Sequence, residues 1–227
     1  MKREIDALLK ALGETKTVDG RDIRYQDEML DNDYYVGKIG DKEVAVIHSG
    51  VGMTYASIVT LLAIEKLKPE LVINTGCAGS LNEDIHVSDI VVADRVADWR
   101  YDVFDWERGI NSVYTSYPCD KRVADIASKI KSKSKIRVGN IVSANEFIYK
   151  KSQLKEIKRY YPDALCGEME GCAIANTCYA FNVPCSIIRS ISDETLVNSS
   201  FKDYYFNVDK ACQAAADLCV KIVKRFK

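Results

Sequence analysis

The residues best suited to chemistry gather in two segments of the second half of the chain. In the first, Gly167–Ala175, the carboxylates Glu168 and Glu170 flank a methionine just before an apolar helical pattern. A carboxylate held there could bind two adjacent hydroxyl groups, because each of its oxygens can accept an O–H. The plainer interpretation is an acidic first helical turn, which the helix dipole favours. The segment alone leaves both interpretations open.

The second segment, Ile187–Asp193, has the pattern of an apolar strand that ends in Arg, Ser and Asp. Arg189 lies inside this pattern, and burying a cation without a partner is costly. Asp193 could cap the next segment, or it could serve as an acid. The arginine favours a functional site, and the type of site stays open.

Two glycine-containing segments are weaker candidates. Asn74–Ser80 follows the apolar run at Leu71–Ile73, and its small residues would let main-chain amides approach a ligand. Ser49–Gly52 lies between a strand pattern and a helix pattern, where N–H groups at the helix start can hold an anion. It lacks the Gly-Lys-Ser/Thr ending of a nucleotide-binding P-loop. Glycine turns close many strands, so neither segment decides anything alone.

Short β-branched runs alternating with helical patterns must position these residues. Strands are predicted at Tyr34–Ile39, Glu43–His48, Leu71–Gly76, Asp89–Val96, Ile136–Ser143 and Cys185–Ile191. Helices are predicted at Glu4–Leu12, Tyr55–Leu67, Asp120–Lys131, Gln153–Tyr161, Met169–Phe181 and Tyr205–Phe226. This order predicts a single α/β domain with a central mixed, largely parallel β-sheet flanked by helices. Ligands in such folds bind where strands end and helices begin.

Composition narrows the classes of function. The 227 residues carry 32 basic and 33 acidic side chains without a basic stripe, which argues against nucleic acid as a partner. No stretch approaches the roughly 18 apolar residues of a membrane span, and the first residues do not resemble a signal peptide. The eight cysteines lie mostly in apolar segments without a C-x-x-C pair, so we expect reduced thiols and no metal site. A soluble, cytoplasmic protein is expected.

In their order and spacing, these segments together resemble the nucleoside phosphorylase/nucleosidase superfamily, and most closely its methylthioadenosine/S-adenosylhomocysteine nucleosidase branch. The most specific parts are Asn74–Gly79, Ser143–Ile148, Glu168–Glu170, Arg189–Asp193 and Asn182–Pro184. The resemblance runs from Glu4 to the C-terminus and implies one nucleoside phosphorylase-like domain over residues 1–227.

The resemblance implies hydrolysis of the N-glycosidic bond of 5'-methylthioadenosine, S-adenosylhomocysteine or a related adenine nucleoside, in methionine salvage and without a metal or cofactor. It implies that Asp193 protonates N7 of the departing adenine and that Ser192 orients this carboxylate. Glu4 would activate the attacking water. A neutral purine leaves more easily than an anion, and general acid help is typically worth ~10²–10⁴ in rate.

Further contacts with the nucleoside are implied residue by residue. Phe147 would stack on the base, and the Ile148 main chain would recognise its edge. Glu170 would bind the ribose hydroxyls above Met169, and Arg189 would hold Glu168 and Glu170 together. Lesser contacts with the substrate are implied for Cys77, Ala78 and Gly79, with Cys77 near the sugar. Val51, Val103 and Phe201 are implied to line the pocket for the 5'-thio group.

The resemblance also implies a homodimer in which each subunit closes its neighbour's pocket. Trp106 is the candidate aromatic contribution, within the aromatic-rich segment from Trp99 to Trp106. Exposed apolar patches tend to be interaction surfaces. Packing of these rings within one subunit is the alternative.

Three departures from the family pattern stand out. Relatives usually place a strand ending in Gly-Ala-Met before the catalytic glutamate, whereas here Glu4 follows three residues, so that strand is expected to be missing. Glu43–His48 is the best candidate to substitute for it. If that segment already has its own place in the sheet, as the resemblance implies, we expect either a rearranged sheet edge or a displaced and mobile Glu4. Cys77 stands where many relatives have serine, and Gly171-Cys172 replaces small or polar residues, which should be tolerated.

Other functions on the same fold remain open. A purine nucleoside phosphorylase would need cations for phosphate, usually arginine; Ile73–Thr75 offers none, although Arg3 lies near another possible position. A hydrolase of a modified futalosine shares most of these residues. A non-catalytic nucleoside-binding relative would not need both Glu4 and Asp193. Analysis of the sugar product with and without phosphate separates these alternatives.

Overall fold

The computed structural model describes residues 2–18, 34–100, 104–105, 110–111, 116–195 and 201–227; of these, the side chains of 2–4, 104–105, 110–111 and 201–204 are not described. Within these ranges a six-stranded sheet forms the centre, in the order β11-β4-β10-β9-β5-β8. Its strands are β4 (Val72–Ser80), β5 (Ile90–Asp98), β8 (Ser116–Pro118), β9 (Ile136–Ser143), β10 (Ala164–Glu168) and β11 (Cys185–Glu194).

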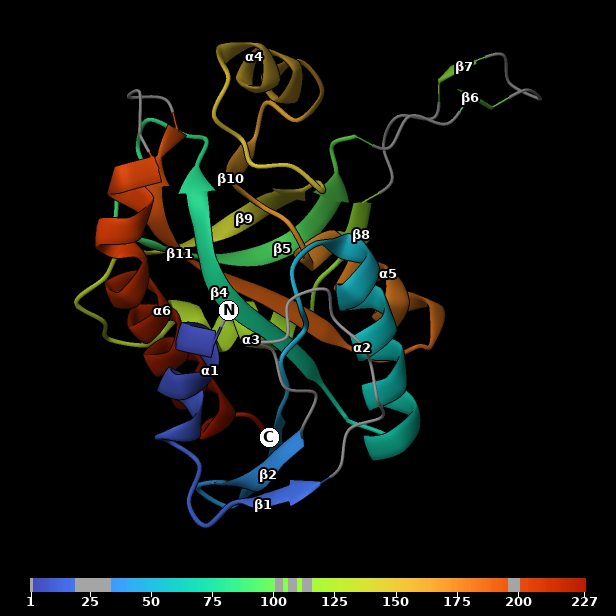
Figure 1. Ribbon diagram of the computed structural model, residues 1–227, viewed down its shortest axis with the longest axis vertical. Helices are drawn as coiled ribbons and strands as arrows, with labels where there is room; N and C mark the ends of the chain where they lie inside the picture. The colour runs from blue at the N-terminus through green and yellow to red at the C-terminus, as the bar shows by residue number, and fades with distance from the viewer. Residues whose placement is uncertain (1, 19–33, 101–103, 106–109, 112–115, 196–200) are drawn as a thin grey trace.

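The sheet is mixed, as predicted. The extended pairings β11–β4, β5–β9 and β10–β9 are parallel. The short pairings β10–β4, β5–β8 and β11–β5 are antiparallel. The contact of β11 with both β4 and β5 curls the sheet, which is visible as a strongly twisted centre in Figure 1.

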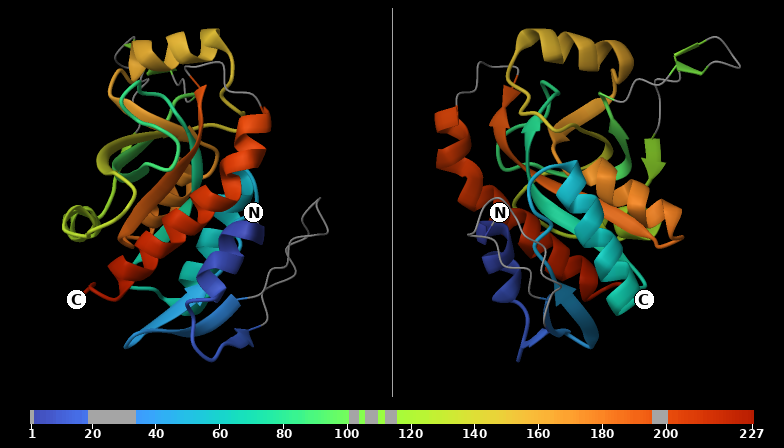
Figure 2. Two further views of the ribbon diagram at one scale, coloured as in Figure 1. Left: turned by 90° about the vertical axis from the view of Figure 1, so that its left-hand side faces the viewer. Right: turned by 45° about the vertical axis from the view of Figure 1, so that its right-hand side comes forward.

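Helices cover the sheet on two sides. They are α1 (Lys2–Leu9), α2 (Met53–Leu67), α3 (Lys121–Ser128), α4 (Lys151–Tyr160), α5 (Gly171–Ala180) and α6 (Phe201–Val223). α6 packs on β11 and β4 and carries α1 on its outside, whereas α2 and α5 pack together on the other side (Figures 1 and 2). β11 is therefore buried along Cys185–Asp193 on both faces, which explains its nearly continuous apolar sequence. None of the helices in the described part of the chain has the length and apolarity needed to cross a membrane.

A separate antiparallel sheet contains β1 (Lys16–Val18), β2 (Tyr34–Ile39) and β3 (Lys42–Val46). The predicted hairpin of β2 and β3 is confirmed, and its turn uses Gly40 at a positive φ of 68°. β3 pairs with β2 and makes no pairing with the six-stranded sheet in the described residues. Glu43–His48, the candidate substitute for a strand of the central sheet, therefore has its own place in a separate sheet, and the expectation of a rearranged sheet edge or a displaced Glu4 stays a prediction.

Other differences from the sequence-based prediction concern strand ends. β4 does not stop at Gly76 but continues to Ser80, because these small residues pair with β11 and β10. The segment expected to follow the strand is thus part of it. β10 was not predicted at all, since only five residues form it and its end is polar. The short hairpin of β6 (Phe104–Asp105) and β7 (Ile110–Asn111) was also missed.

The eight cysteines are free thiols, and most are buried. Burial raises the pKa of Cys219 to about 12, and it also raises the pKa of Cys166. Thiols with raised pKa values carry little thiolate and are poorly reactive. Cys166 and Cys219 therefore act as small hydrophobic residues, in agreement with the prediction, whereas hydrogen bonds with Cys119 and Cys178 lower the pKa of the Cys185 thiol.

Candidate active site

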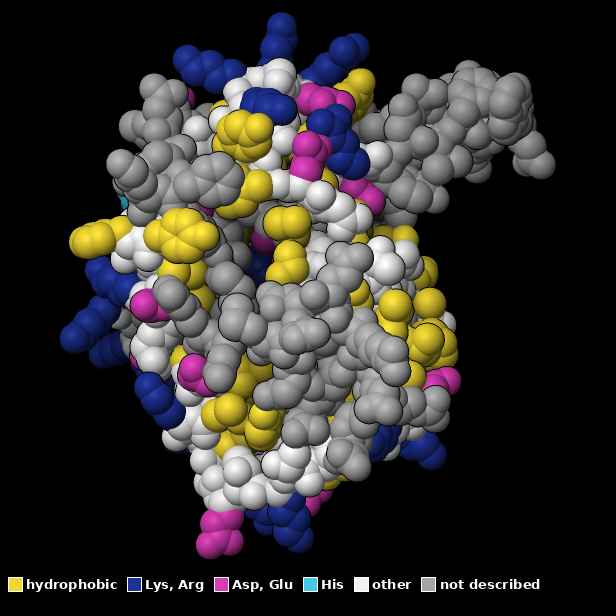
Figure 3. Space-filling view, in the orientation of Figure 1, with side chains coloured by type: hydrophobic (Ala, Val, Ile, Leu, Met, Phe, Trp, Pro, Cys, Tyr) yellow, Lys and Arg dark blue, Asp and Glu magenta, His cyan; other side chains and the backbone are white. Residues whose placement is uncertain are grey.

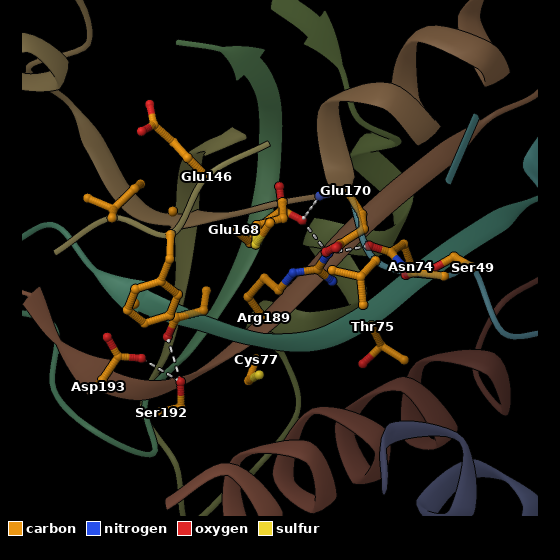
Figure 4. A pocket seen from close by; sticks show the side chains of 18 residues that line it. Ser49, Asn74, Thr75, Cys77, Glu146, Glu168, Glu170, Arg189, Ser192 and Asp193 are labelled. Atoms are coloured by element: carbon orange, nitrogen blue, oxygen red, sulfur yellow. Dashed lines mark hydrogen bonds and ion pairs between the residues drawn. The ribbon is translucent and has the colours of Figure 1, made fainter. Parts of the chain in front are cut away.

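A pocket collects polar side chains from β4, β10 and β11, from the segment that follows β9, and from the turn before α2. Figure 3 shows it as a hollow with acidic and basic atoms at its floor, and Figure 4 shows its lining. The lining residues are Ser49, Gly50, Val51, Asn74, Thr75, Cys77, Ala78, Gly79, Glu146, Phe147, Ile148, Gly167, Glu168, Met169, Glu170, Arg189, Ser192 and Asp193.

Glu168, at the end of β10, is the most heavily bonded of these carboxylates. Its Oε2 accepts the main-chain N–H groups of Glu170 (2.9 Å) and Gly171 (2.7 Å) at the start of α5. Its Oε1 accepts the hydroxyl of Ser143, which lies directly opposite on β9. Glu168 thus places a carboxylate at the start of α5, where the helix dipole favours negative charge, although the first turn of α5 itself contains no acidic residue.

Arg189 compensates this buried charge. Its guanidinium donates to Glu168 and to the side-chain oxygen of Asn74, and it lies 4.0 Å from a Glu170 oxygen. The Arg189 residue is 2% exposed. A charge this deep requires partners, and Arg189 finds them on β4 and at both ends of the Glu168–Glu170 segment.

Glu170 connects the acidic segment with the turn before α2. Its Oε1 accepts the Gly52 N–H at 2.8 Å, and Gly52 has a positive φ of 87° that suits glycine. The next N–H, from Met53, donates to the side chain of Asn145 at 2.7 Å. Two of the N–H groups at this helix start, those of Gly52 and Met53, are therefore occupied by protein oxygens.

Asp193 enters the pocket beside Ser192. The Ser192 hydroxyl donates to Asp193 Oδ1 at 2.7 Å and lies 3.3 Å from the Ala78 carbonyl oxygen. Consecutive strand residues normally face opposite sides, but the pairing of β11 with β4 shifts register between Ile191 and Asp193. Such a bulge re-aims side chains, and both residues line the pocket. A Cβ at Gly79 would come within 2.9 Å of Asp193 Oδ2, so a larger residue there would displace this carboxylate.

The segment Asn145–Lys150 forms another wall and is organised by Gln153 of α4. The Gln153 side-chain oxygen accepts the N–H groups of Tyr149 (3.0 Å) and Lys150 (2.8 Å). Its nitrogen donates to the Phe147 carbonyl (3.1 Å) and to Glu146 (3.0 Å). On the outer side, the hydrogen bond from Arg100 holds the pKa of Glu146 below its usual value.

The pocket therefore has two sides. We call Asn74, Glu168, Glu170 and Arg189 the carboxylate side, and Phe147, Ile148, Ser192 and Asp193 the Asp193 side. Figure 4 shows Asp193 and Ser192 apart from the cluster of Glu168, Glu170 and Arg189. A carboxylate side suits hydroxyl donors. An aromatic ring, a strip of main chain that lines the pocket and an acid suit a flat heterocycle.

Comparison with known proteins agrees with this arrangement. The family model described as "Phosphorylase superfamily" matches residues 1–224. A 5'-methylthioadenosine/S-adenosylhomocysteine nucleosidase of Desulfotalea psychrophila is 34% identical over 199 residues, covering 86% of this chain and 85% of the relative. One of Maridesulfovibrio salexigens is 32% identical over 230 residues, covering 99% and 96%. This chain belongs to the 5'-methylthioadenosine/S-adenosylhomocysteine nucleosidase family.

Solved structures of family members share the fold. The nucleosidase of S. pneumoniae, in complex with the transition-state inhibitor MT-ImmA, superimposes with a TM-score of 0.88 at 25% identity, covering 100% of this chain and 96% of that one. The nucleosidase of Neisseria meningitidis, in complex with methylthio-immucillin-A, gives 0.88 at 26% identity with the same coverage. The predicted family and nucleoside phosphorylase-like fold are confirmed.

Most residues that the family resemblance singled out line this pocket. They are Val51, Cys77, Ala78, Gly79, Phe147, Ile148, Glu168, Met169, Glu170, Arg189, Ser192 and Asp193. Glu4 lies in α1 and Phe201 begins α6, but their side chains are outside the described part of the chain, as are Val103 and Trp106. Their roles stay predictions.

Sequence reasoning missed several positioning residues. Asn74 and Ser143 lie inside the family motifs, but their residue types do not predict that Asn74 accepts a hydrogen bond from Arg189 or that Ser143 donates one to Glu168. Asn145 was not assigned a role, and Gln153 was treated as the first residue of an ordinary helix. The signal available for Gln153 was a glutamine at the third position of a helix start, which is typical of a capping box.

Proposed function

We propose that this chain hydrolyses the N-glycosidic bond of 5'-methylthioadenosine, S-adenosylhomocysteine or a related adenine nucleoside, releasing adenine and a 5'-thioribose. The observation that carries the proposal is a pocket with a buried acid, Asp193, on one side and an anchored carboxylate, Glu170, on the other. The relatives named above as nucleosidases of these substrates support it.

Asp193 is the proposed general acid. It protonates or hydrogen-bonds N7 of the base, so that a neutral purine leaves instead of an anion. The Ser192 hydroxyl donates to Asp193 Oδ1. This hydrogen bond fixes the orientation of the whole carboxyl group, including Oδ2. Proton transfer requires this kind of positioning before the strength of the acid matters.

The carboxylate side is proposed to bind the ribose. Glu170 accepts the sugar hydroxyls above Met169, while Glu168 and Arg189 hold it in place through the start of α5. As the bond breaks, positive charge develops on the sugar. Fixed negative charge nearby then stabilises the transition state more than the ground state.

Water is the proposed nucleophile, and Glu4 is proposed to activate it. A phosphorylase would instead bind phosphate through cations. Among the described residues that line the pocket, Arg189 is the sole cation, and it is engaged by Glu168 and Asn74. The N–H groups of Gly52 and Met53 are engaged as well. These contacts favour hydrolysis over phosphorolysis.

The deciding experiment is incubation with 5'-methylthioadenosine, with and without phosphate, followed by chromatography of base and sugar. We expect free adenine and 5-methylthioribose at a rate independent of phosphate. A sugar 1-phosphate as main product would move the protein to the phosphorylases. Binding without turnover would make it a nucleoside-binding relative.

We further propose a homodimer that works in methionine salvage in the cytoplasm. Val51 lines the pocket but is 53% exposed, so this wall is open in one subunit and a partner could close it. Eight free thiols suit a reducing compartment. Sedimentation that shows a fully active monomer at micromolar concentration would contradict the dimer.

A further inference from the structure

Gln153 occupies an unusual position for a helix residue because all of its polar atoms are used on the wall of the pocket. The side chain is buried, and the residue is 4% exposed. Its oxygen accepts two main-chain N–H groups, and its nitrogen donates to one carbonyl and one carboxylate. The amide can make four hydrogen bonds in all, and here it makes all four within Glu146–Lys150.

These bonds leave out one residue, Ile148. Gln153 satisfies the Phe147 carbonyl on one side of it and the Tyr149 and Lys150 N–H groups on the other. The Ile148 main chain makes no hydrogen bond to any described residue, although the residue is 7% exposed and lines the pocket. Buried main-chain groups are nearly always paired, so this donor and acceptor await a ligand.

The side chain of Ile148 is fixed as well. A Cβ on Gly167 would come within 2.4 Å of Ile148 Cδ1, so the isoleucine packs directly on that glycine. Packing from β10 and the Gln153 amide thus hold the same residue from two directions. Glu146, which receives one of the Gln153 hydrogen bonds, is held in turn by Arg100, whose guanidinium lies 4.0 Å from the centre of the Trp99 ring.

We infer that Gln153 is a specificity-determining positioning residue, which pairs the neighbouring main-chain groups so that the Ile148 N–H and carbonyl alone read the edge of the base. The inference rests on the proposed function. A 6-amino purine presents an acceptor at N1 and a donor at N6, which complements one N–H and one carbonyl. A 6-oxo purine presents the reverse order, and its mismatched polar groups would be left unpaired on burial.

A helix cap is the competing explanation, because Gln153 also accepts the N–H of Lys150, the N-cap residue of α4. The two explanations differ in which bonds matter. Capping needs the oxygen that accepts the Lys150 N–H, whereas positioning also needs the nitrogen that donates to Phe147 and Glu146. Gln153→Glu keeps the acceptor oxygens and replaces this donor by a second anionic oxygen beside Glu146. Gln153→Met removes all four bonds at similar volume.

The test measures kcat and KM for 5'-methylthioadenosine and for its 6-oxo analogue, 5'-methylthioinosine, together with calorimetric binding of adenine and hypoxanthine. For both variants we expect the preference for the 6-amino compound to fall about tenfold, which corresponds to loss of roughly one neutral hydrogen bond. KM should rise more than kcat falls. Lys155→Ala, on the exposed face of the same helix, is the matched control and should leave both unchanged.

Retention of the wild-type base preference in Gln153→Glu, with or without a lower melting temperature, would overturn the inference and leave Gln153 as a cap. Calorimetry keeps the inference separate from the proposed function. A wild-type protein that prefers adenine but does not cleave the nucleoside contradicts the function alone, and the adenine-to-hypoxanthine ratio of the variants still decides the role of Gln153. A wild-type protein without any preference for adenine overturns the inference.

Discussion

The two sides of the pocket differ in how their buried polar groups are paired. On the carboxylate side, Glu168 accepts hydrogen bonds from a hydroxyl, two main-chain amides and a guanidinium. Its charge is therefore compensated within the protein before any ligand arrives. On the Asp193 side, the Ile148 main chain has no partner among the described residues. This side is completed by what it binds.

The difference predicts which measurements respond to substitution. Removing one partner of a buried charge pair leaves the other uncompensated, which destabilises the fold strongly. Groups that pair mainly with a ligand add little to the stability of the free protein. Substitutions on the carboxylate side should thus lower stability and activity together, whereas those on the Asp193 side should lower activity with small changes in stability.

The largest effect on activity is expected for Asp193→Asn. A large change in stability in this variant would contradict the proposed difference between the two sides of the pocket. Asparagine keeps the shape and can still accept the Ser192 hydroxyl, but it cannot supply the proton. We expect kcat to fall about 10²–10⁴-fold with nucleoside binding and melting temperature preserved. Steady-state kinetics, calorimetry and thermal unfolding check this. Near wild-type turnover would refute the assignment of Asp193 as the acid.

Arg189→Met tests the carboxylate side. It leaves Glu168 buried without its cation, and we expect a loss of roughly 3–5 kcal/mol in the free energy of unfolding. Denaturant unfolding measures this directly, with Arg122→Met as control, because Arg122 is an exposed arginine paired with Asp120. Adding Glu168→Gln to Arg189→Met should recover part of the loss, since the uncompensated charge is then removed. No coupling in this double-mutant cycle would contradict the proposed pairing.

Ser143→Ala tests whether the hydrogen bonds around Glu168 stabilise the fold, by comparison with a buried serine of β11. The Ser143 hydroxyl donates to Glu168 and accepts the Cys172 N–H at 2.8 Å. Its removal leaves a buried N–H unpaired and should cost about 1–3 kcal/mol of stability. Ser186→Ala is the matched control, because Ser186 is fully buried and its hydroxyl has no hydrogen-bond partner among the described residues. Equal losses in the two variants would show that the Glu168 network contributes nothing special.

The sequence predicted much of the framework that carries this pocket. A nearly continuous apolar run marked β11, because that strand is buried on both faces. β-branched residues marked β9, and helical spacing marked α2 and α6. β10 escaped notice since its five residues mix apolar and polar types. The end of β4 was misplaced because its glycines look like a turn, whereas pairing with β11 and β10 keeps them extended.

The site was partly predictable for a similar reason. Arg189 in an apolar strand and the Glu-Met-Glu segment violate simple packing, so they pointed to chemistry. The partners that stabilise them are ordinary residue types whose contacts arise only in three dimensions. Ser143 faces Glu168 through strand pairing, and Gln153 reaches Glu146 through the turn before α4. The first relation leaves no sequence pattern, and the capping-box signal of Gln153 indicates a helix start but not the bond to Glu146.

The smallest effect is expected for Glu146→Gln, on the outer surface of the wall that carries Phe147 and Ile148. The hydrogen bond from Arg100 holds the pKa of Glu146 below its ordinary value of 4.5. A carboxyl whose pKa is lowered on folding contributes stability above its unfolded-state pKa, and this contribution disappears as the pH falls through the folded-state value. The Arg100 and Glu146 side chains are 43% and 37% exposed, so solvent screens the pair. We expect the variant to lose about 0–1 kcal/mol at pH 7 and nothing at pH values well below 4.5.

The new amide oxygen of the Glu146→Gln variant can still accept the Gln153 hydrogen bond, so preference for the 6-amino base should persist. Urea unfolding at both pH values measures the stability difference, and Glu156→Gln, which removes the other partner of Arg100, is the control. A loss above about 2 kcal/mol, beyond the range of exposed pairs, would mean that charge on the outer surface of this wall supports the fold as it does on the carboxylate side.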